Sequence, residues 1–147
     1  MSFSRFNPFT THFVFMSPLE GIILKDGKPL PYVDIDVIVS MQSGKKQTYK
    51  HNTNAEGFFE LPMIKKWVYV TALSHFAVYQ NVKVTYNGRI YTIWSSSKTE
   101  PELYAELDPS SYPPRVTCDL DDEKLHYEGR FRGSILTRCR WTGMREA

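Results

Sequence analysis

The order of hydrophobic and polar residues along the chain is typical of short β-strands. In the clearest segment, apolar residues alternate with mostly polar ones and stand at Val33, Ile35, Val37 and Val39. Successive side chains of a strand point to opposite faces, so this segment is predicted as a strand with one buried face and one largely wet face. Helical periodicity is almost absent, and Gly, Pro, Asn and Asp separate the apolar runs, which favours a β-sandwich or barrel.

Further strands are predicted at residues 21–24, 47–50, 58–61, 67–73, 115–120, 124–127 and 135–141. The segment 67–73 is rich in β-branched and aromatic residues and is expected to be a central strand. The last segment alternates arginines with Cys139 and Trp141, a pattern typical of a charged edge strand.

The Asn87–Gly88 dipeptide predicts a β-hairpin, because it favours the two-residue type I′ turn. The expected partners are Tyr86 with Arg89, Val84 with Tyr91 and Val82 with Ile93. In this register the two valines share a face with Ile93, whereas Trp94 lies on the opposite face.

The chain has 147 residues, the usual size of one domain. We expect a single all-β sandwich over residues 1–147 with about seven or eight strands. Residues 99–107 are expected to form one short helix, with Thr99 as N-cap and Pro101 in the first turn. Residues 1–18 are expected to form an aromatic N-terminal arm. This arm either folds over the core or, if its rings are exposed together, marks a protein interface. Residues 115–147 are expected to add C-terminal strands.

The composition argues against some classes of function but does not identify the function. The net charge of +2 gives no argument for a nucleic-acid or membrane partner, and the aromatic content of 14% supports a β-rich fold. We expect a cytoplasmic protein, because no export signal and no long apolar run is recognisable. In such a compartment Cys118 and Cys139 are expected to be free thiols, with one disulfide as the alternative.

The segment from Gly21 to Pro62 carries a family resemblance. Its three motifs are Gly21-Ile22-Ile23-Leu24, Gly27-Lys28-Pro29-Leu30 and the run from Thr53 to Pro62. Together they resemble the carboxypeptidase-regulatory-like and transthyretin-like domains, which implies a Greek-key, immunoglobulin-like β-sandwich. Gly27 and Gly57 suit turns with positive φ, and Phe59 is expected to supply a core ring. Val33 stands where that family usually has a small residue.

The Asn87–Gly88 hairpin and the run Val116-Thr117-Cys118-Asp119-Leu120 resemble a second group of proteins. These are uncharacterised bacterial proteins in which a transthyretin-like domain stands alone, near contact-dependent toxin systems such as type VI secretion. The resemblance implies an immunity or adaptor role.

An enzymatic alternative comes from the same fold family. The segments Thr53 to Phe58 and Phe131 to Ser134 resemble two motifs of 5-hydroxyisourate hydrolases. However, Phe58 replaces the arginine of the first motif and the paired histidine segment is missing, so the groups needed for water activation and charge stabilisation are lacking. We therefore predict no catalytic residues, no metal site and no cofactor, since the histidines and cysteines also lack metal-ligand spacing.

The acidic residues are the candidate protein-binding site. The predicted binding residues are Glu100, Glu102, Asp121, Asp122 and Glu123. An acidic patch would steer a basic partner, while the plainer interpretation is a set of solvated loops. The predicted function is a non-enzymatic protein-binding module, most concretely a bacterial immunity protein that neutralises a cognate secreted toxin by direct binding. The alternatives are an adaptor or structural subunit of a secretion or surface assembly, and the isourate-type hydrolase.

Overall fold

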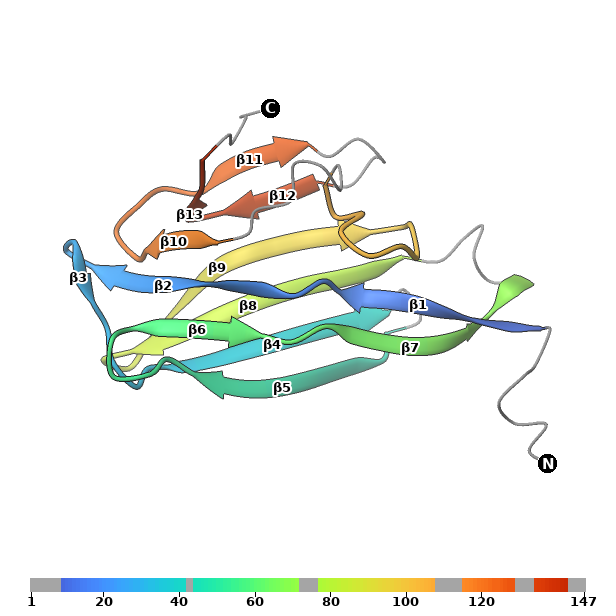
Figure 1. Ribbon diagram of the computed structural model, residues 1–147, viewed down its shortest axis with the longest axis horizontal. Helices are drawn as coiled ribbons and strands as arrows, with labels where there is room; N and C mark the ends of the chain where they lie inside the picture. Colours follow the sequence, from blue (N-terminus) through green and yellow to red (C-terminus); the bar gives the residue numbers. More distant parts are fainter. Residues whose placement is uncertain (1–8, 42–43, 72–76, 108–114, 129–133, 143–147) are drawn as a thin grey trace.

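The computed structural model describes residues 9–41, 44–71, 77–107, 115–128 and 134–142, and these residues form a sandwich of β-strands (Figure 1). In chain order the described strands are β1 (Thr10–Met16), β2 (Leu19–Lys25), β3 (Lys28–Pro29), β4 (Asp34–Met41), β5 (Lys46–Asn52), β6 (Phe58–Leu61), β7 (Ile64–Tyr69), β8 (Val78–Tyr86), β9 (Arg89–Lys98), β10 (Val116–Asp119), β11 (Leu125–Glu128), β12 (Ser134–Thr137) and β13 (Cys139–Arg140). The all-β prediction is confirmed.

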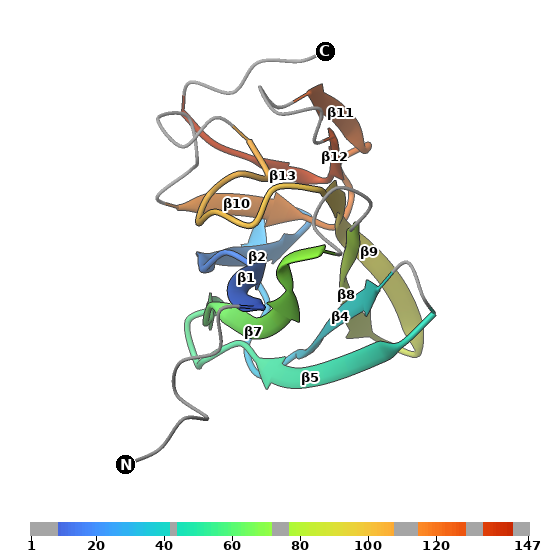
Figure 2. The same cartoon turned by 90° about the vertical axis from the view of Figure 1, so that its right-hand side faces the viewer.

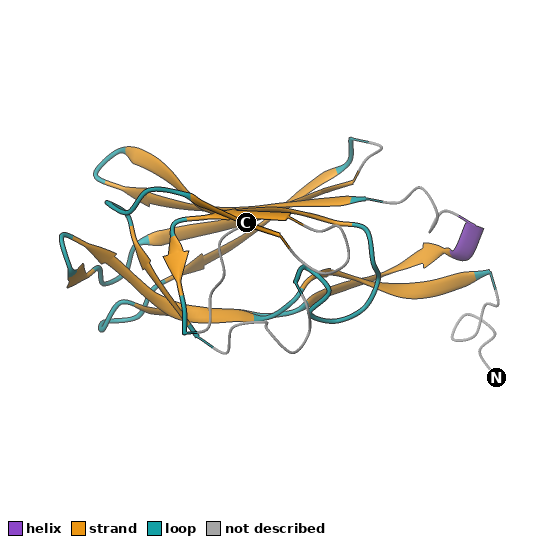
Figure 3. Cartoon of the chain, turned by 90° about the horizontal axis from the view of Figure 1, so that it is seen from above, coloured by secondary structure: helices purple, strands orange, loops and turns teal. Residues whose placement is uncertain are grey.

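Two layers face each other across the core (Figures 2 and 3). One layer is a six-stranded sheet in the order β11-β12-β9-β8-β4-β5. The other contains a five-stranded sheet, in which β2 pairs with β3, β6 and β10, and β10 pairs with β13. The two-stranded ribbon β1-β7 continues the line of β2 and β6, and its outer part, with the start of β1 and the end of β7, projects past the six-stranded sheet (Figure 1).

The predicted one-sided strand is β4. Its inward residues Ile35, Val37 and Val39 are 0%, 1% and 3% exposed, and Val33, just before the strand, is 8% exposed. Apolar side chains from both layers meet here, and Phe59, with 3% exposure, is a core ring as expected. The turns also form as predicted, since Gly27 and Gly57 have φ values of +73° and +82°.

The β8–β9 hairpin follows the predicted register near its turn and then departs from it. Tyr86 pairs with Arg89 and Val84 with Tyr91, but Val82 pairs with Trp94 because a register shift falls between Val82 and Lys83. The prediction that Trp94 lies on the opposite face was therefore wrong. The shift allows both Ile93 and Trp94 to be fully buried, and a β-bulge reorients side chains in this way.

The predicted central strand at 67–73 was also wrong. Residues 67–69 belong to β7, which pairs only with β1 among the described strands and is therefore part of a ribbon rather than the middle of a sheet, while residues 72–73 lie outside the described residues. Alternation then leaves Trp67 and Tyr69 on a face that no second layer covers, where they are 55% and 66% exposed.

The helix expected at 99–107 does not form. These residues make turns, and Tyr104 has a φ of +66°, which a right-handed helix excludes. The carbonyl oxygens of Glu100 and Glu102 accept hydrogen bonds from the Lys98 ammonium, and the Glu102 carbonyl also accepts from the Ala105 amide at 3.4 Å, which is the i+3 spacing of a turn and not the i+4 spacing of an α-helix. The described residues include no α-helix, and none of their helical segments has the length and apolar character needed to cross a membrane.

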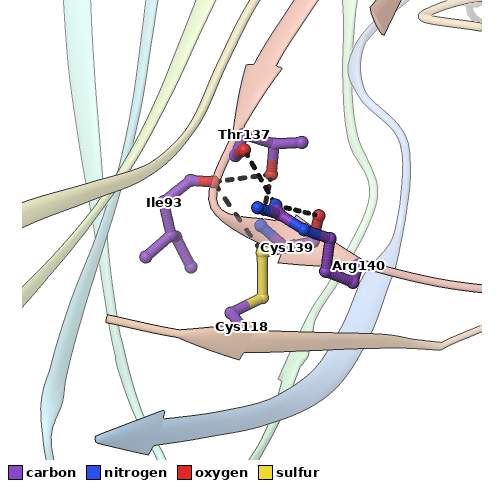
Figure 4. Close-up of a disulfide and its surroundings, with 5 residues drawn as sticks. All are labelled: Ile93, Cys118, Thr137, Cys139 and Arg140. Carbon is purple, nitrogen blue, oxygen red and sulfur yellow. Dashed lines mark hydrogen bonds between the residues drawn. A yellow bond between two sulfur atoms is a disulfide. The ribbon is translucent and has the colours of Figure 1, made fainter. Parts of the chain in front are cut away.

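The expectation of free thiols was wrong as well. Cys118 of β10 and Cys139 of β13 are directly opposite each other and form a disulfide (Figure 4). The predicted strand 135–141 is in fact split, because the chain leaves the six-stranded sheet after Thr137 and joins the other sheet at Cys139. The Ile93 carbonyl fixes this crossing by accepting hydrogen bonds from the Thr137 hydroxyl (2.7 Å) and the Arg138 amide (3.0 Å).

Candidate functional site

A buried polar cluster joins the loop after β9 to the junction between β1 and β2. The Glu106 carboxylate accepts hydrogen bonds from the Ser17 amide (2.7 Å), the Ser17 hydroxyl (2.6 Å) and the Gln80 amide group (3.0 Å). Gln80 in turn accepts a hydrogen bond from the Trp94 indole at 3.1 Å. Glu106 and Ser17 have no solvent exposure, and the hydrogen bonds within the cluster take the place of bonds to water.

Lys98 is the second charged residue of this region. Its side chain is fully buried, donates to the Glu100 and Glu102 carbonyl oxygens, and lies 5.1 Å from the centre of the Phe13 ring. Burial lowers the pKa of Lys98 to about 8, although the nearby Glu106 carboxylate opposes this shift.

The cluster has the chemistry of a structural site. A lysine with a lowered pKa beside a carboxylate is also found in catalytic sites, but here neither Lys98 nor Glu106 is accessible to a substrate. Their contacts hold residues 99–107 against β1 and β2, and this is the role that the geometry supports.

The structure does not bring the five predicted acidic residues together. The loop with Glu100 and Glu102 is bound to Ser17, just before β2, whereas Asp121 binds Lys25 at the end of β2. Eight residues of extended chain span about 26 Å at roughly 3.3 Å per residue. The acidic residues therefore form two separate groups at opposite ends of β2.

The second group, in the β10–β11 turn, is accompanied by its own cations. Asp121 accepts hydrogen bonds from the Lys25 ammonium at 2.6 Å and the Asp26 amide at 2.9 Å, and the bond from Lys25 is the main reason that the pKa of Asp121 is lowered to about 2. Arg138 and Arg140 donate to the backbone carbonyls of Asp122 (2.6 Å) and Glu123 (2.8 Å). These contacts reduce the negative field that a basic partner would meet.

The hydrolase-like motif residues have structural roles where the structure describes them. The Thr53 hydroxyl is buried, donates to the Leu30 carbonyl at 2.7 Å and accepts from the Val33 amide at 2.9 Å. Phe58 is 43% exposed, and residues 131–133 of the second motif lie outside the described residues. Within the described ranges, no group of His, Cys, Asp and Glu could hold a metal ion.

Of the four described large aromatic side chains that are more than half exposed, three lie on the β1–β7 ribbon or at its end, and the fourth is Tyr32. Thr10 pairs with Tyr69 and His12 with Trp67, so these residues share one face of the ribbon. The His12 and Trp67 rings are 3.6 Å apart between centroids, and the Val70 amide donates to the Phe9 carbonyl at 2.8 Å. We call this end of the ribbon the aromatic ribbon surface. His12, Trp67 (55% exposed) and Tyr69 (66%) lie on one face of it, while Phe9 (70%) and Val70 (43%), which alternation turns to the other side, lie at the end of the ribbon.

Sequence reasoning identified only part of this surface. The aromatic N-terminus was recognised as a possible interface, but Phe13 and Phe15 are buried and only Phe9 of the described phenylalanines in that arm is exposed. Phe3 and Phe6 lie outside the described residues. Trp67 and Tyr69 were assigned to a central strand, although two aromatic residues at alternate positions beside Lys65 and Lys66 are a signal for an exposed strand face.

Residues 19–123 match the model of a protein family described as a domain of unknown function, DUF6795. The chain belongs to the DUF6795 family. The DUF6795 segment begins at β2 and ends in the turn after β10, so β1 and the strands β11 to β13 lie outside it. No curated protein and no solved structure matches the chain.

Proposed function

We propose that this DUF6795 protein is a non-enzymatic protein-binding module whose interface is centred on the aromatic ribbon surface. The observation that carries the proposal is the exposure of Trp67 and Tyr69 on one face of the two-stranded ribbon, with Phe9, also more than half exposed, at the end of the ribbon. Adjacent exposed aromatic side chains are typical of protein interfaces, because they bury a large area at a small loss of conformational entropy.

The predicted acidic residues contribute to this interface unequally. The Val14 amide donates to the Pro101 carbonyl at 2.9 Å, which places the loop with Glu100 and Glu102 beside β1. We assign these two residues to the rim of the interface. Asp121, Asp122 and Glu123, at the other end of β2, are proposed as a separate, weaker contact. The partner is thus expected to present an apolar pocket with basic residues around it.

The proposed partner is a toxin that the protein neutralises by direct binding. The support for this is the resemblance of the hairpin and of Val116 to Leu120 to stand-alone transthyretin-like proteins near toxin systems. A Greek-key transthyretin-like topology is part of the same proposal. It is supported by the turns at Gly27 and Gly57 and by the burial of Phe59.

The proposed location is the cytoplasm, where the toxin of a neighbouring cell would act. A reducing compartment keeps cysteines as thiols, whereas the Cys118–Cys139 disulfide favours an oxidising one. Acid quenching of cells followed by alkylation in denaturant distinguishes the two states. In the proposed location the pair would be reduced in the cell and would close to the disulfide of the structure only on oxidation, so full alkylation of both cysteines is expected; protection of the pair would place the protein in an oxidising compartment.

The interface is tested by comparing two matched variants. The partner that co-purifies with the tagged protein is identified, produced separately and titrated against wild type, Trp67→Ser/Tyr69→Ser and Tyr79→Ser by calorimetry. Tyr79 is the control because it is 43% exposed but lies on β8, in the other sheet. The ribbon variant should weaken binding at least about tenfold, a loss of about 1.4 kcal/mol, while Tyr79→Ser retains it.

Three results would count against the proposal. Equal affinity of the ribbon variant and wild type would remove the surface. A partner that is harmless when expressed alone would remove the toxin assignment and favour the adaptor alternative. Recovery of this chain alone, as an assembly of defined mass in light scattering, would favour a structural subunit.

A further inference from the structure

A lysine-rimmed cavity lies between the two layers, on the face of the β1–β7 ribbon opposite to Trp67 and Tyr69. It has a volume of about 400 Å³, and its lining residues come from both layers: Phe15, Val39, Met41, Lys45, Lys46, Gln47 and Lys66. Small-molecule sites in proteins usually have volumes of roughly 300–1,000 Å³. The cavity is therefore large enough for a small ligand.

The floor of the cavity is apolar and belongs to the core. Phe15 and Val39 are only 2% and 3% exposed, and Met41 packs against the core cluster. A ligand whose apolar part reaches this floor would remove its own apolar surface from water. The favourable free energy of that burial is roughly 25 cal/mol per Å².

The polar residues at the rim of the cavity occupy inward-facing strand positions, which are usually apolar in a β-sandwich. On β7, Lys66 lies between the buried Ile64 and Val68 on the inward face, and its ammonium is 5.8 Å from the centre of the Phe15 ring. On β5, Gln47 is opposite the buried Val39. A cation and an amide thus face the space between the sheets, in which core residues would be expected.

The β4–β5 turn fixes a second cation beside the same floor. The Met41 amide donates to the Lys45 carbonyl at 2.7 Å, and the Gly44 amide donates to the Met41 carbonyl at 2.8 Å. These two bonds hold Lys45 next to Met41, with Lys46 following at the start of β5. In the part of the chain that the structure describes, Lys45, Lys46 and Lys66 form no ion pair, while Lys50 of β5 pairs with Asp36 at 3.2 Å.

We infer that this cavity binds a small amphipathic anion, such as a medium-chain carboxylate. The apolar tail would lie on Phe15, Val39 and Met41, and the carboxylate would be placed among the ammonium groups of Lys45, Lys46 and Lys66. Gln47 supplies an additional hydrogen-bond donor at the rim. Charge complementarity selects the ligand, because a neutral or cationic head group gains nothing from three unpaired lysines.

The inference is tested with three ligands that differ only in their head groups. Octanoate, octan-1-ol and octylamine are titrated into the isotope-labelled full chain, and amide and methyl chemical shifts are followed by NMR. Octanoate should perturb Val39, Met41 and Gln47 in a saturable manner, with an affinity at least about tenfold higher than that of octan-1-ol, and octylamine should not bind. Equal affinities for the three ligands, or no saturable shift at the cavity with octanoate, would overturn the inference.

Matched variants locate the anion. Lys45→Gln/Lys66→Gln, which removes two positive charges at the cavity, should weaken octanoate binding at least about tenfold, whereas Lys50→Gln, which removes one positive charge from β5 outside the cavity, should leave it unchanged. Similar spectra of the free proteins would show that the variants fold. Equal octanoate affinity in the Lys45→Gln/Lys66→Gln variant and in Lys50→Gln would refute the site.

Discussion

Lys98 is a cation without solvent contact, and its surroundings determine how it titrates. Its ammonium lies above the Phe13 ring and donates to two backbone carbonyls, which orient it but do not replace its hydration. Burial is the main cause of the lowered pKa, and the Glu106 carboxylate opposes it. Lys66, by contrast, is only partly buried and reaches the cavity.

The titration of Lys98 predicts how stability depends on pH. The pKa is about 8 in the folded chain and near its ordinary value of 10.5 in the unfolded chain. Between these values the unfolded chain binds more protons, so stability should rise with pH, by at most about 3 kcal/mol. Urea unfolding from pH 7 to pH 10.5 measures this rise, and Lys98→Met should lack it. Parallel profiles for the two proteins would contradict the assignment.

At the scale of elements, β2 organises the five-stranded sheet. It pairs with β6 and β3 in antiparallel fashion and with β10 in parallel. Gly21 of β2 lies opposite Val116 of β10, and a Cβ atom at this glycine would be 2.1 Å from the Val116 carbonyl oxygen. The close approach of the two backbones explains why the motif begins with glycine.

Gly21→Ala is therefore expected to destabilise the protein by about 3 kcal/mol, because the clash is with backbone and β10 must move. Gly44→Ala is the control. Its position has a φ of +95° but no atom within 4 Å of the added Cβ, so its cost should be about 1 kcal/mol. Urea unfolding of both variants checks the difference. Equal losses would show that backbone conformation, and not the β2–β10 contact, governs the effect.

At the scale of the whole molecule, the segment from Thr137 to Cys139 connects the two sheets. The Ile93 carbonyl and the Thr137 hydroxyl hold the crossing, because the Cys139 amide donates to that hydroxyl at 2.9 Å (Figure 4). The disulfide then fixes β13 to β10, across a sequence separation of 21 residues. Strands at the C-terminal end are thereby tied to the family segment, which ends before Cys139.

Cross-linking of a loop of this length lowers the entropy of the unfolded chain, which stabilises a protein by about 3 kcal/mol. Cys118→Ser/Cys139→Ser should lose this amount in urea unfolding, and wild type treated with a reductant should match the double variant. An unchanged unfolding midpoint for both would mean that the disulfide adds no stability.

Local features of the fold were predictable, and long-range ones were not. The inward face of β4 and the Asn87–Gly88 turn followed from alternation and from turn chemistry. The burial of Trp94 required a bulge whose signal is absent from the sequence pattern. The acidic residues were predicted as one site, and the pairing of Asp121 with Lys25 divides them. Neither the aromatic ribbon surface nor the cavity was recognised as a unit, since each combines residues from two strands or more.

The sequence by itself determined the all-β class, most strand positions and the tight turns, because these depend on neighbouring residues and on the two-residue period of a strand. Only the tertiary structure decided which sheet each strand joins, which aromatic residues are exposed, and that the two cysteines pair. Ser17 and Glu106 show the reason: they are 89 residues apart in the chain and in direct contact in the fold. Contacts of this kind arise when the sheets pack, and no local pattern encodes them.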